Sequence, residues 1–146
     1  MREGEPTLAC VILVDVPHAA ALLVELRETM RTIPELPDGL RPANWEEAYA
    51  IQDAMHDLGA WTVGALKVGC TSEAARTALA IDEPIGGRVP AHRMHASGGH
   101  IDRSTFHHEP LLESEFALRI ARDLPADQSV GSLDDVRTLV DAVAPA

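Results

Sequence analysis

The sequence is poor in cysteine, in aromatic residues and in basic residues, and each shortage excludes a class of protein. Its two cysteines, Cys10 and Cys70, form no CxxC pair and no disulfide framework, so we expect a reducing, cytoplasmic setting. Only five of its 146 residues are aromatic, so Ala, Val, Leu and Ile must build most of the core. Twelve basic against twenty-three acidic residues give a formal charge of −11. This charge argues against binding to nucleic acid or to an anionic membrane.

Long hydrophobic runs and common catalytic motifs are also missing. The longest apolar run near the start, Leu8 to Val14, is too short to span a bilayer. The leader before it lacks the charge pattern and the cleavage site of a secretory signal, so we interpret this region as an added strand or an unsettled tail. The absence of GxGxxG, GxxxxGK[ST], GxSxG and HExxH leaves dinucleotide, P-loop, serine hydrolase and zincin functions without support.

The patterns that are present predict a single domain of the α+β class. Apolar spacing and capping residues predict helices over residues 16–30, 45–58, 73–80 and 133–146, with Asn44, Ser72 and Ser132 as N-caps for the last three. Strands are predicted over residues 61–69 and 111–125, a turn over 82–87, and an irregular stretch over 88–110. Because helices and strands mix without a regular βαβ alternation, α+β is the favoured class.

Lys67 is the first candidate for chemistry. In the predicted strand it shares a face with Trp61, Val63 and Ala65, so its cation points where apolar side chains point. Two interpretations are open. The side chain lies near the strand end and extends its ammonium group into water, or burial makes the ammonium acidic enough to serve as an acid/base.

Glu113 and Glu115 are the second candidate. Both fall within the apolar run LLESEFALRIARDLP, and alternation in a strand points the two carboxylates to the same side. Neighbouring like charges are tolerable in water but need a cation or a proton in an enclosed site. Taken alone, the pattern favours two glutamates on the solvent-exposed face of a half-buried antiparallel strand over a pair of metal ligands.

Histidines and a cysteine offer weaker candidates. Five histidines lie between residues 92 and 108, and His92 with His95 could contribute to a transition-metal site, although the spacing matches no standard zinc pattern. Cys70 precedes a predicted helix, which could make it a nucleophile, but no histidine partner is defined. Solvated loop histidines and an inert thiol are the favoured interpretations.

The motifs, taken in order, resemble the 2-keto-4-pentenoate hydratase family of the fumarylacetoacetate hydrolase superfamily. The resemblance runs from about His18 to Ala146 and rests on AYAIQ (48–52), LKVGCTS (66–72), IDEPIGGRV (81–89), LLESEFALRIARDLP (111–125) and the closing DAVAPA. It implies a leader over residues 1–17 and, over 18–146, the N-terminal portion of one hydratase-like domain. Helices would be followed there by the start of a mixed β-rich, fumarylacetoacetate-hydrolase-like fold, incomplete at its end.

The resemblance also implies a chemistry. Lys67 matches the family's active-site lysine, and Glu113 and Glu115 match two ligands of Mg²⁺ or Mn²⁺, whose third glutamate would lie just beyond Ala146. The family consists of homo-oligomeric lyases that act on small 2-hydroxydienoates or 2-oxo acids in the catabolism of aromatic compounds.

Two alternatives stay open beside a hydratase. Ile85 in DEPIGG departs from the aspartate of many hydratases and matches 4-oxalocrotonate decarboxylases. The chain could also be a nonenzymatic fragment that acts only in assembly, and alone it is expected not to turn over a 2-hydroxydienoate.

Overall fold

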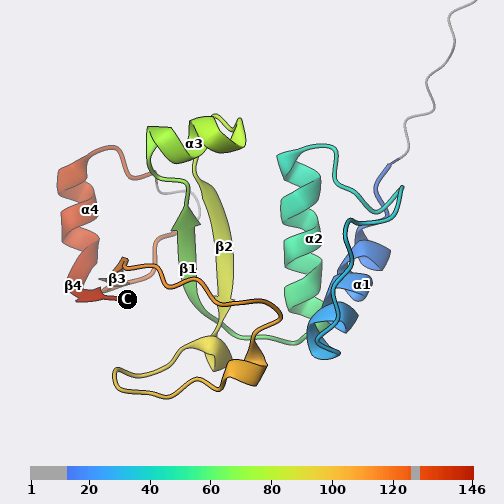
Figure 1. Cartoon of the computed structure of the whole chain (residues 1–146). Coiled ribbons are helices and arrows are strands. Elements are labelled where there is room, and N and C mark those ends of the chain that lie inside the picture. Colours follow the sequence, from blue (N-terminus) through green and yellow to red (C-terminus); the bar gives the residue numbers. More distant parts are fainter. Residues whose placement is uncertain (1–12, 126–128) are drawn as a thin grey trace, which may run out of the picture. The chain divides into compact units, whose positions relative to one another are not determined.

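The computed structural model describes residues 13–125 and 129–146, which form two compact units with the boundary after His107 (Figure 1). The described residues contain four α-helices and two small antiparallel sheets, so the predicted α+β class is confirmed. No described helix is long and apolar enough to cross a membrane. The prediction that residues 18–146 make up one domain stays a prediction. Most of the run Leu8 to Val14 lies outside the described residues.

Two helices that lie side by side begin the first unit (Figure 1). α1 (Val16–Glu28) begins after Asp15, whose carboxylate accepts a hydrogen bond from the backbone N–H of His18 at 3.1 Å. α2 (Trp45–Leu58) begins after Asn44, whose side chain accepts from the N–H of Glu47 at 2.9 Å. Both predicted helices are confirmed, and a small core is buried between them and the segment that joins them: Ala19, Ala20, Leu40 and Ile51.

A hairpin-like pair of strands follows, with a short helix between them. β1 (Val63–Gly69) pairs antiparallel with β2 (Ile85–Pro90), and Lys67 lies opposite Gly87 in the register. α3 (Glu73–Leu79) connects the strands and is capped by Ser72, as predicted. The predicted turn over residues 82–87 is wrong from Ile85 onward. Glycines usually signal a turn, but here backbone pairing with β1 continues through Gly86 and Gly87.

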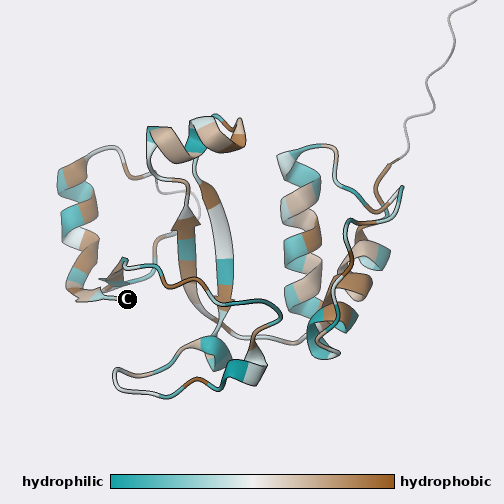
Figure 2. Ribbon diagram, viewed as in Figure 1, coloured by the Kyte–Doolittle hydropathy of each residue, from teal (hydrophilic) through white to brown (hydrophobic). Residues whose placement is uncertain are grey.

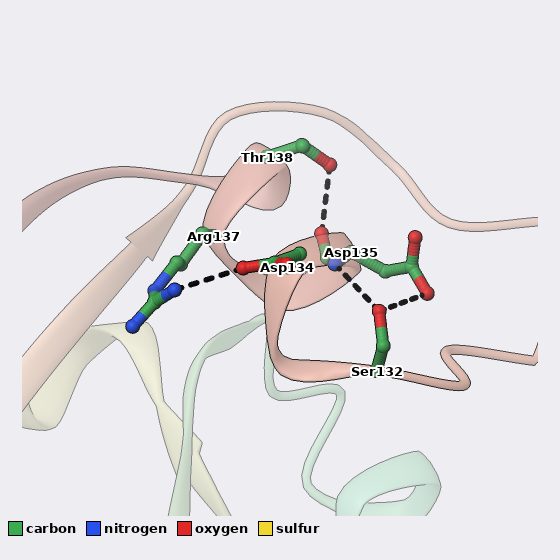
Figure 3. Close-up of polar contacts among 5 residues, drawn as sticks. All are labelled: Ser132, Asp134, Asp135, Arg137 and Thr138. Carbon is green, nitrogen blue, oxygen red and sulfur yellow. Dashed lines mark hydrogen bonds and ion pairs between the residues drawn. The ribbon is translucent and has the colours of Figure 1, made fainter.

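The second unit combines one helix with a two-stranded antiparallel sheet. α4 (Leu133–Leu139) begins at the predicted cap: the hydroxyl of Ser132 accepts from the N–H of Asp135 at 3.1 Å and donates to its carboxylate at 2.7 Å (Figure 3). Arg137 donates to Asp134 at 2.8 Å on the same turns. The start of the predicted helix is therefore confirmed.

The second half of that predicted helix is wrong. The chain leaves the helix after Leu139 and forms β4 (Val140–Pro145), which pairs antiparallel with β3 (Phe116–Ile120). β-branched Val140 and Val143 suit a strand, and Pro145 cannot donate a helical hydrogen bond. The strand predicted over residues 111–125 is likewise shorter than expected, because regular pairing is limited to the length that β4 offers.

An exposed ion pair joins the two strands of this sheet. Arg119 donates to the two carboxylate oxygens of Asp141 at 2.7 and 3.1 Å. The hydrogen bond from Arg119 lowers the pKa of the Asp141 carboxyl from its ordinary value of 3.8. A lowered carboxyl pKa means that the stabilisation is present above the ordinary value and is lost as the pH falls through the lowered one.

We therefore expect Arg119→Gln to raise the titration midpoint of the Asp141 carboxyl toward its ordinary value. The measurement is an NMR pH titration of the aspartate side-chain carbons. Arg137→Gln is the matched control, because Arg137 bonds Asp134 instead, and it should leave the Asp141 midpoint in place. An unchanged midpoint in Arg119→Gln would show that the pair does not form in solution.

Much apolar surface stays exposed in the described residues. Figure 2 shows apolar stretches along β1 and on α1. In the second unit, the side chains of Leu111, Leu112 and Phe116 are 93%, 99% and 82% exposed. Among the described residues of this unit, Leu139 is the buried one. A surface of this kind usually marks a region that contacts other polypeptide.

Candidate functional site

Lys67 lies on the wall of a pocket of about 350 Å³ in the first unit. β1 contributes Lys67 with its neighbours Leu66 and Val68, β2 contributes the backbone around Gly86, and α2 contributes polar side chains. Lys67 is also the only lysine in the sequence. The pocket therefore combines one ammonium group with several hydrogen-bonding groups, which is the usual composition of a site for a small polar ligand.

Side chains of α2 hold the outer edge of β2. The hydroxyl of Tyr49 accepts from the N–H of Gly86 at 3.0 Å. Gln52 accepts from the N–H of Arg88 at 2.9 Å and donates to the carbonyl of Gly86 at 3.3 Å, so its amide takes the place of a neighbouring strand. Arg88 in turn forms an ion pair with Asp53 at 2.7 Å.

These contacts position Lys67 indirectly, because Gly87 is its partner across the two strands. Tyr49, Gln52 and Asp53 were not singled out as site residues from the sequence. The signal that could have found two of them is the motif AYAIQ, which contains Tyr49 and Gln52 and carried part of the family resemblance.

The surroundings of Lys67 differ from the expected apolar face. The register shifts between Val63 and Ala65, which interrupts the strict alternation that placed Lys67 with Trp61 and Val63. Lys67 is exposed in this structure. Its catalytic role stays a prediction.

Glu113 and Glu115 lie in the second unit, at the start of the sheet. Glu115 exchanges two backbone hydrogen bonds with Ala146, at 3.0 and 2.9 Å, and so extends the pairing of β3 with β4 by one residue. Both glutamates are exposed. The two glutamates belong to the second unit and Lys67 to the first.

The donor set of this pair fits a hard cation. Carboxylate oxygens are the ligands that Mg²⁺ prefers, and proteins often hold it through one or two carboxylates while it keeps several waters. No group of three His, Cys, Asp or Glu side chains close enough to share a metal occurs within residues 13–125 and 129–146. The assignment of Glu113 and Glu115 as metal ligands stays a prediction.

The histidines and Cys70, the weaker candidates from the sequence, gain no support from the structure. His92 and His95 belong to no three-ligand cluster in the part of the chain that the structure describes, so a histidine zinc site gains no support. Cys70 adopts a left-handed backbone conformation with φ of 57°, and its carbonyl accepts a hydrogen bond from Arg76 at 3.2 Å. Cys70 thus forms the turn between β1 and α3, and this contact gives no evidence for a nucleophilic thiol.

Comparison with known proteins gives three similar relatives, each 34% identical to this chain. The 2-keto-4-pentenoate hydratase of Burkholderia vietnamiensis matches over 113 residues, 75% of this chain and 42% of the relative. The 2-keto-4-pentenoate hydratases 1 and 2 of Dechloromonas aromatica match over 122 and 116 residues, 80% and 75% of this chain and 45% and 43% of the relatives.

The chain thus spans less than half the length of these relatives. No protein-family model matches it. No solved structure matches it either. Over the part that aligns, the resemblance to the 2-keto-4-pentenoate hydratases that the motifs indicated is confirmed.

Proposed function

We propose that this chain carries catalytic residues of a Mg²⁺-dependent hydro-lyase that adds water to a small 2-hydroxydienoate. The observation that carries the proposal is the 34% identity to three proteins named 2-keto-4-pentenoate hydratase, over three quarters or more of the chain. The pocket around Lys67 supports it, because it offers a proton-carrying group beside hydrogen-bonding side chains.

In the proposed reaction, Lys67 holds and moves protons at its Nζ atom during tautomerisation of the dienol to the 2-oxo form, before water adds to the conjugated double bond. Tyr49 and Gln52 act as positioning residues, since they fix the strand edge opposite Lys67. Glu113 and Glu115 would hold the Mg²⁺ or Mn²⁺ ion through their carboxylates. When bound, such an ion neutralises negative charge on the substrate's oxygens and acts as a Lewis acid.

A decarboxylase acting on a related 2-oxo acid is the second candidate. Ile85, the first residue of β2, favours it, because the related decarboxylases carry isoleucine at the matching position. The two reactions are distinguished by their products, since only the decarboxylase releases CO₂. The names of the relatives favour the hydratase.

The proposal includes the wider setting of the family: a fumarylacetoacetate-hydrolase-like fold, a cytoplasmic location and a homo-oligomer. The exposed side chains of Leu111, Leu112 and Phe116 support contact with further polypeptide, as self-association would provide. Assembly without catalysis is the competing possibility, and an activity test separates the two.

The test uses a chimera in which this chain replaces the matched segment of the Burkholderia vietnamiensis relative. We expect the folded chimera to consume a 2-hydroxydienoate in the presence of Mg²⁺, whereas the chain alone should not. Circular dichroism and size-exclusion chromatography establish that the chimera is folded. A folded chimera that binds Mg²⁺ and shows neither hydration nor CO₂ release would contradict the proposed function and favour the assembly role.

A further inference from the structure

A second hollow in the first unit, of about 690 Å³, gathers basic side chains on a chain that is acidic as a whole. Arg27 comes from the end of α1, and Arg93 and His92 come from the short 3-10 helix Ala91–Arg93 after β2. His95 and His100 follow in the irregular stretch and line the same hollow. Three of the seven histidines and two of the twelve Lys and Arg residues thus meet there.

Arg27 is held in place by an aromatic cluster. Its guanidinium lies 5.3 Å from the ring centre of Trp61, in a cation–π arrangement. The ring of Trp61 contacts His56 and His92 edge-on, at centroid distances of 5.5 and 6.2 Å. Because α2, the segment before β1 and the 3-10 helix all contribute to this cluster, the Arg27 side chain has a defined direction.

The side chains of Arg27 and Arg93 line the same hollow. Among the described residues, neither Arg27 nor Arg93 forms an ion pair with an acidic side chain. Burial and the charge of Arg93 lower the pKa of the Arg27 guanidinium from its ordinary value. Arginine nevertheless keeps its charge in proteins, so two like charges are brought together and repel.

Two acidic residues, Glu28 and Asp102, also line the hollow, and among the described residues neither forms an ion pair with Arg27 or Arg93. The carboxylate of Asp102 accepts from the N–H and the hydroxyl of Ser104, at 2.8 and 2.6 Å, which places it at the start of a separate short turn. The histidines form no three-ligand metal cluster in the part of the chain described by the structure. The two guanidinium groups, which have no ion-pair partner among the described residues, therefore favour an anion as the ligand of this hollow.

We propose that this hollow binds a small dianionic ligand group, a phosphoryl group or a dicarboxylate, between Arg27 and Arg93. The planar fork of a guanidinium matches both kinds of oxyanion, and an anion placed between two such groups replaces their repulsion by attraction. The proposal is independent of the hydratase assignment, because it uses none of the residues of the Lys67 pocket.

The test is isothermal titration of the full chain at low salt with inorganic phosphate and, separately, with succinate. We expect at least one of them to bind, and Arg93→Gln to weaken that binding at least about tenfold, since a charge-assisted hydrogen bond is lost. Arg27→Lys serves as a second variant, because it keeps the charge near Trp61 but loses the fork.

Arg31→Gln is the matched control. Arg31 follows α1 and pairs with Glu25 at 3.1 Å, so its replacement removes one charge from the chain without removing a residue that lines the hollow. It should leave the affinity within about twofold, as expected for a screened surface charge. Binding of phosphate identifies a phosphoryl site and binding of succinate a dicarboxylate site. Binding of neither anion, or equal weakening by Arg31→Gln and Arg93→Gln, would overturn the proposal.

Discussion

Replacing Lys67 with methionine is expected to lower kcat for hydration by the chimera about a hundredfold or more, the typical contribution of a positioned acid/base. The methionine keeps a long apolar stem on the pocket wall but removes the group that carries the proton. Binding of Mg²⁺ should be unchanged, because we assign the ion to Glu113 and Glu115. The measurement is steady-state kinetics together with a Mg²⁺ titration.

A second variant separates proton transfer from simple charge. Lys67→Arg keeps a positive charge, but a guanidinium does not give up its proton at neutral pH. If Lys67 moves protons, this variant should be nearly as slow as Lys67→Met. A variant that recovers most of the rate would instead show that only the charge matters.

The control for a general loss of positive charge is Arg137→Met. Arg137 is exposed and contacts Asp134 within α4, so its loss should leave kcat within about twofold, in the range of ordinary surface substitutions. An equal loss of rate in Arg137→Met and Lys67→Met would remove the special role of Lys67.

Replacing both Glu113 and Glu115 with glutamine is the second large effect that we expect. The amides keep the size of the side chains but remove two negative charges, so affinity of the chimera for Mg²⁺ should fall at least about tenfold. Hydration should fall about a hundredfold or more at fixed Mg²⁺, since charge stabilisation by a metal ion is worth several kcal/mol. Titration of the ion and the rate at increasing Mg²⁺ measure both effects.

Glu109→Gln is the matched control for this pair. It removes one carboxylate from the same unit, a few residues before Glu113, and we assign it no role with the ion. Its Mg²⁺ affinity should equal that of the unchanged chimera. If the double variant binds Mg²⁺ as tightly as Glu109→Gln, Glu113 and Glu115 are only residues on the solvent-exposed face of a sheet.

The helix starts could be predicted from the sequence because a cap is a local interaction. Asn44, Ser72 and Ser132 each bond a backbone N–H three residues ahead, and the residue types alone identify them. The end of the last helix could not be predicted in this way. Leu139, Val140 and Val143 fit a helical stripe, and only pairing with β3 makes the final residues a strand.

The residues of the candidate site also differ in whether the sequence alone identifies them. Lys67 and the glutamate pair stand out in the sequence because charges interrupt apolar strands. Tyr49 and Gln52 do not, because polar residues on a helix are ordinary. Their contacts with the edge of β2 join residues more than thirty positions apart, and such pairs are set by tertiary structure.

Our central claim is that Lys67 and an ion that we assign to Glu113 and Glu115 are needed for the same reaction. The most direct measurement is kcat of three folded chimeras: one with Lys67→Met, one with Glu113→Gln and Glu115→Gln, and one with all three substitutions. We predict that the combined variant is about as slow as the slower of the other two, because groups that serve one reaction step do not lose rate additively. Losses of rate that multiply in the combined variant would contradict the claim.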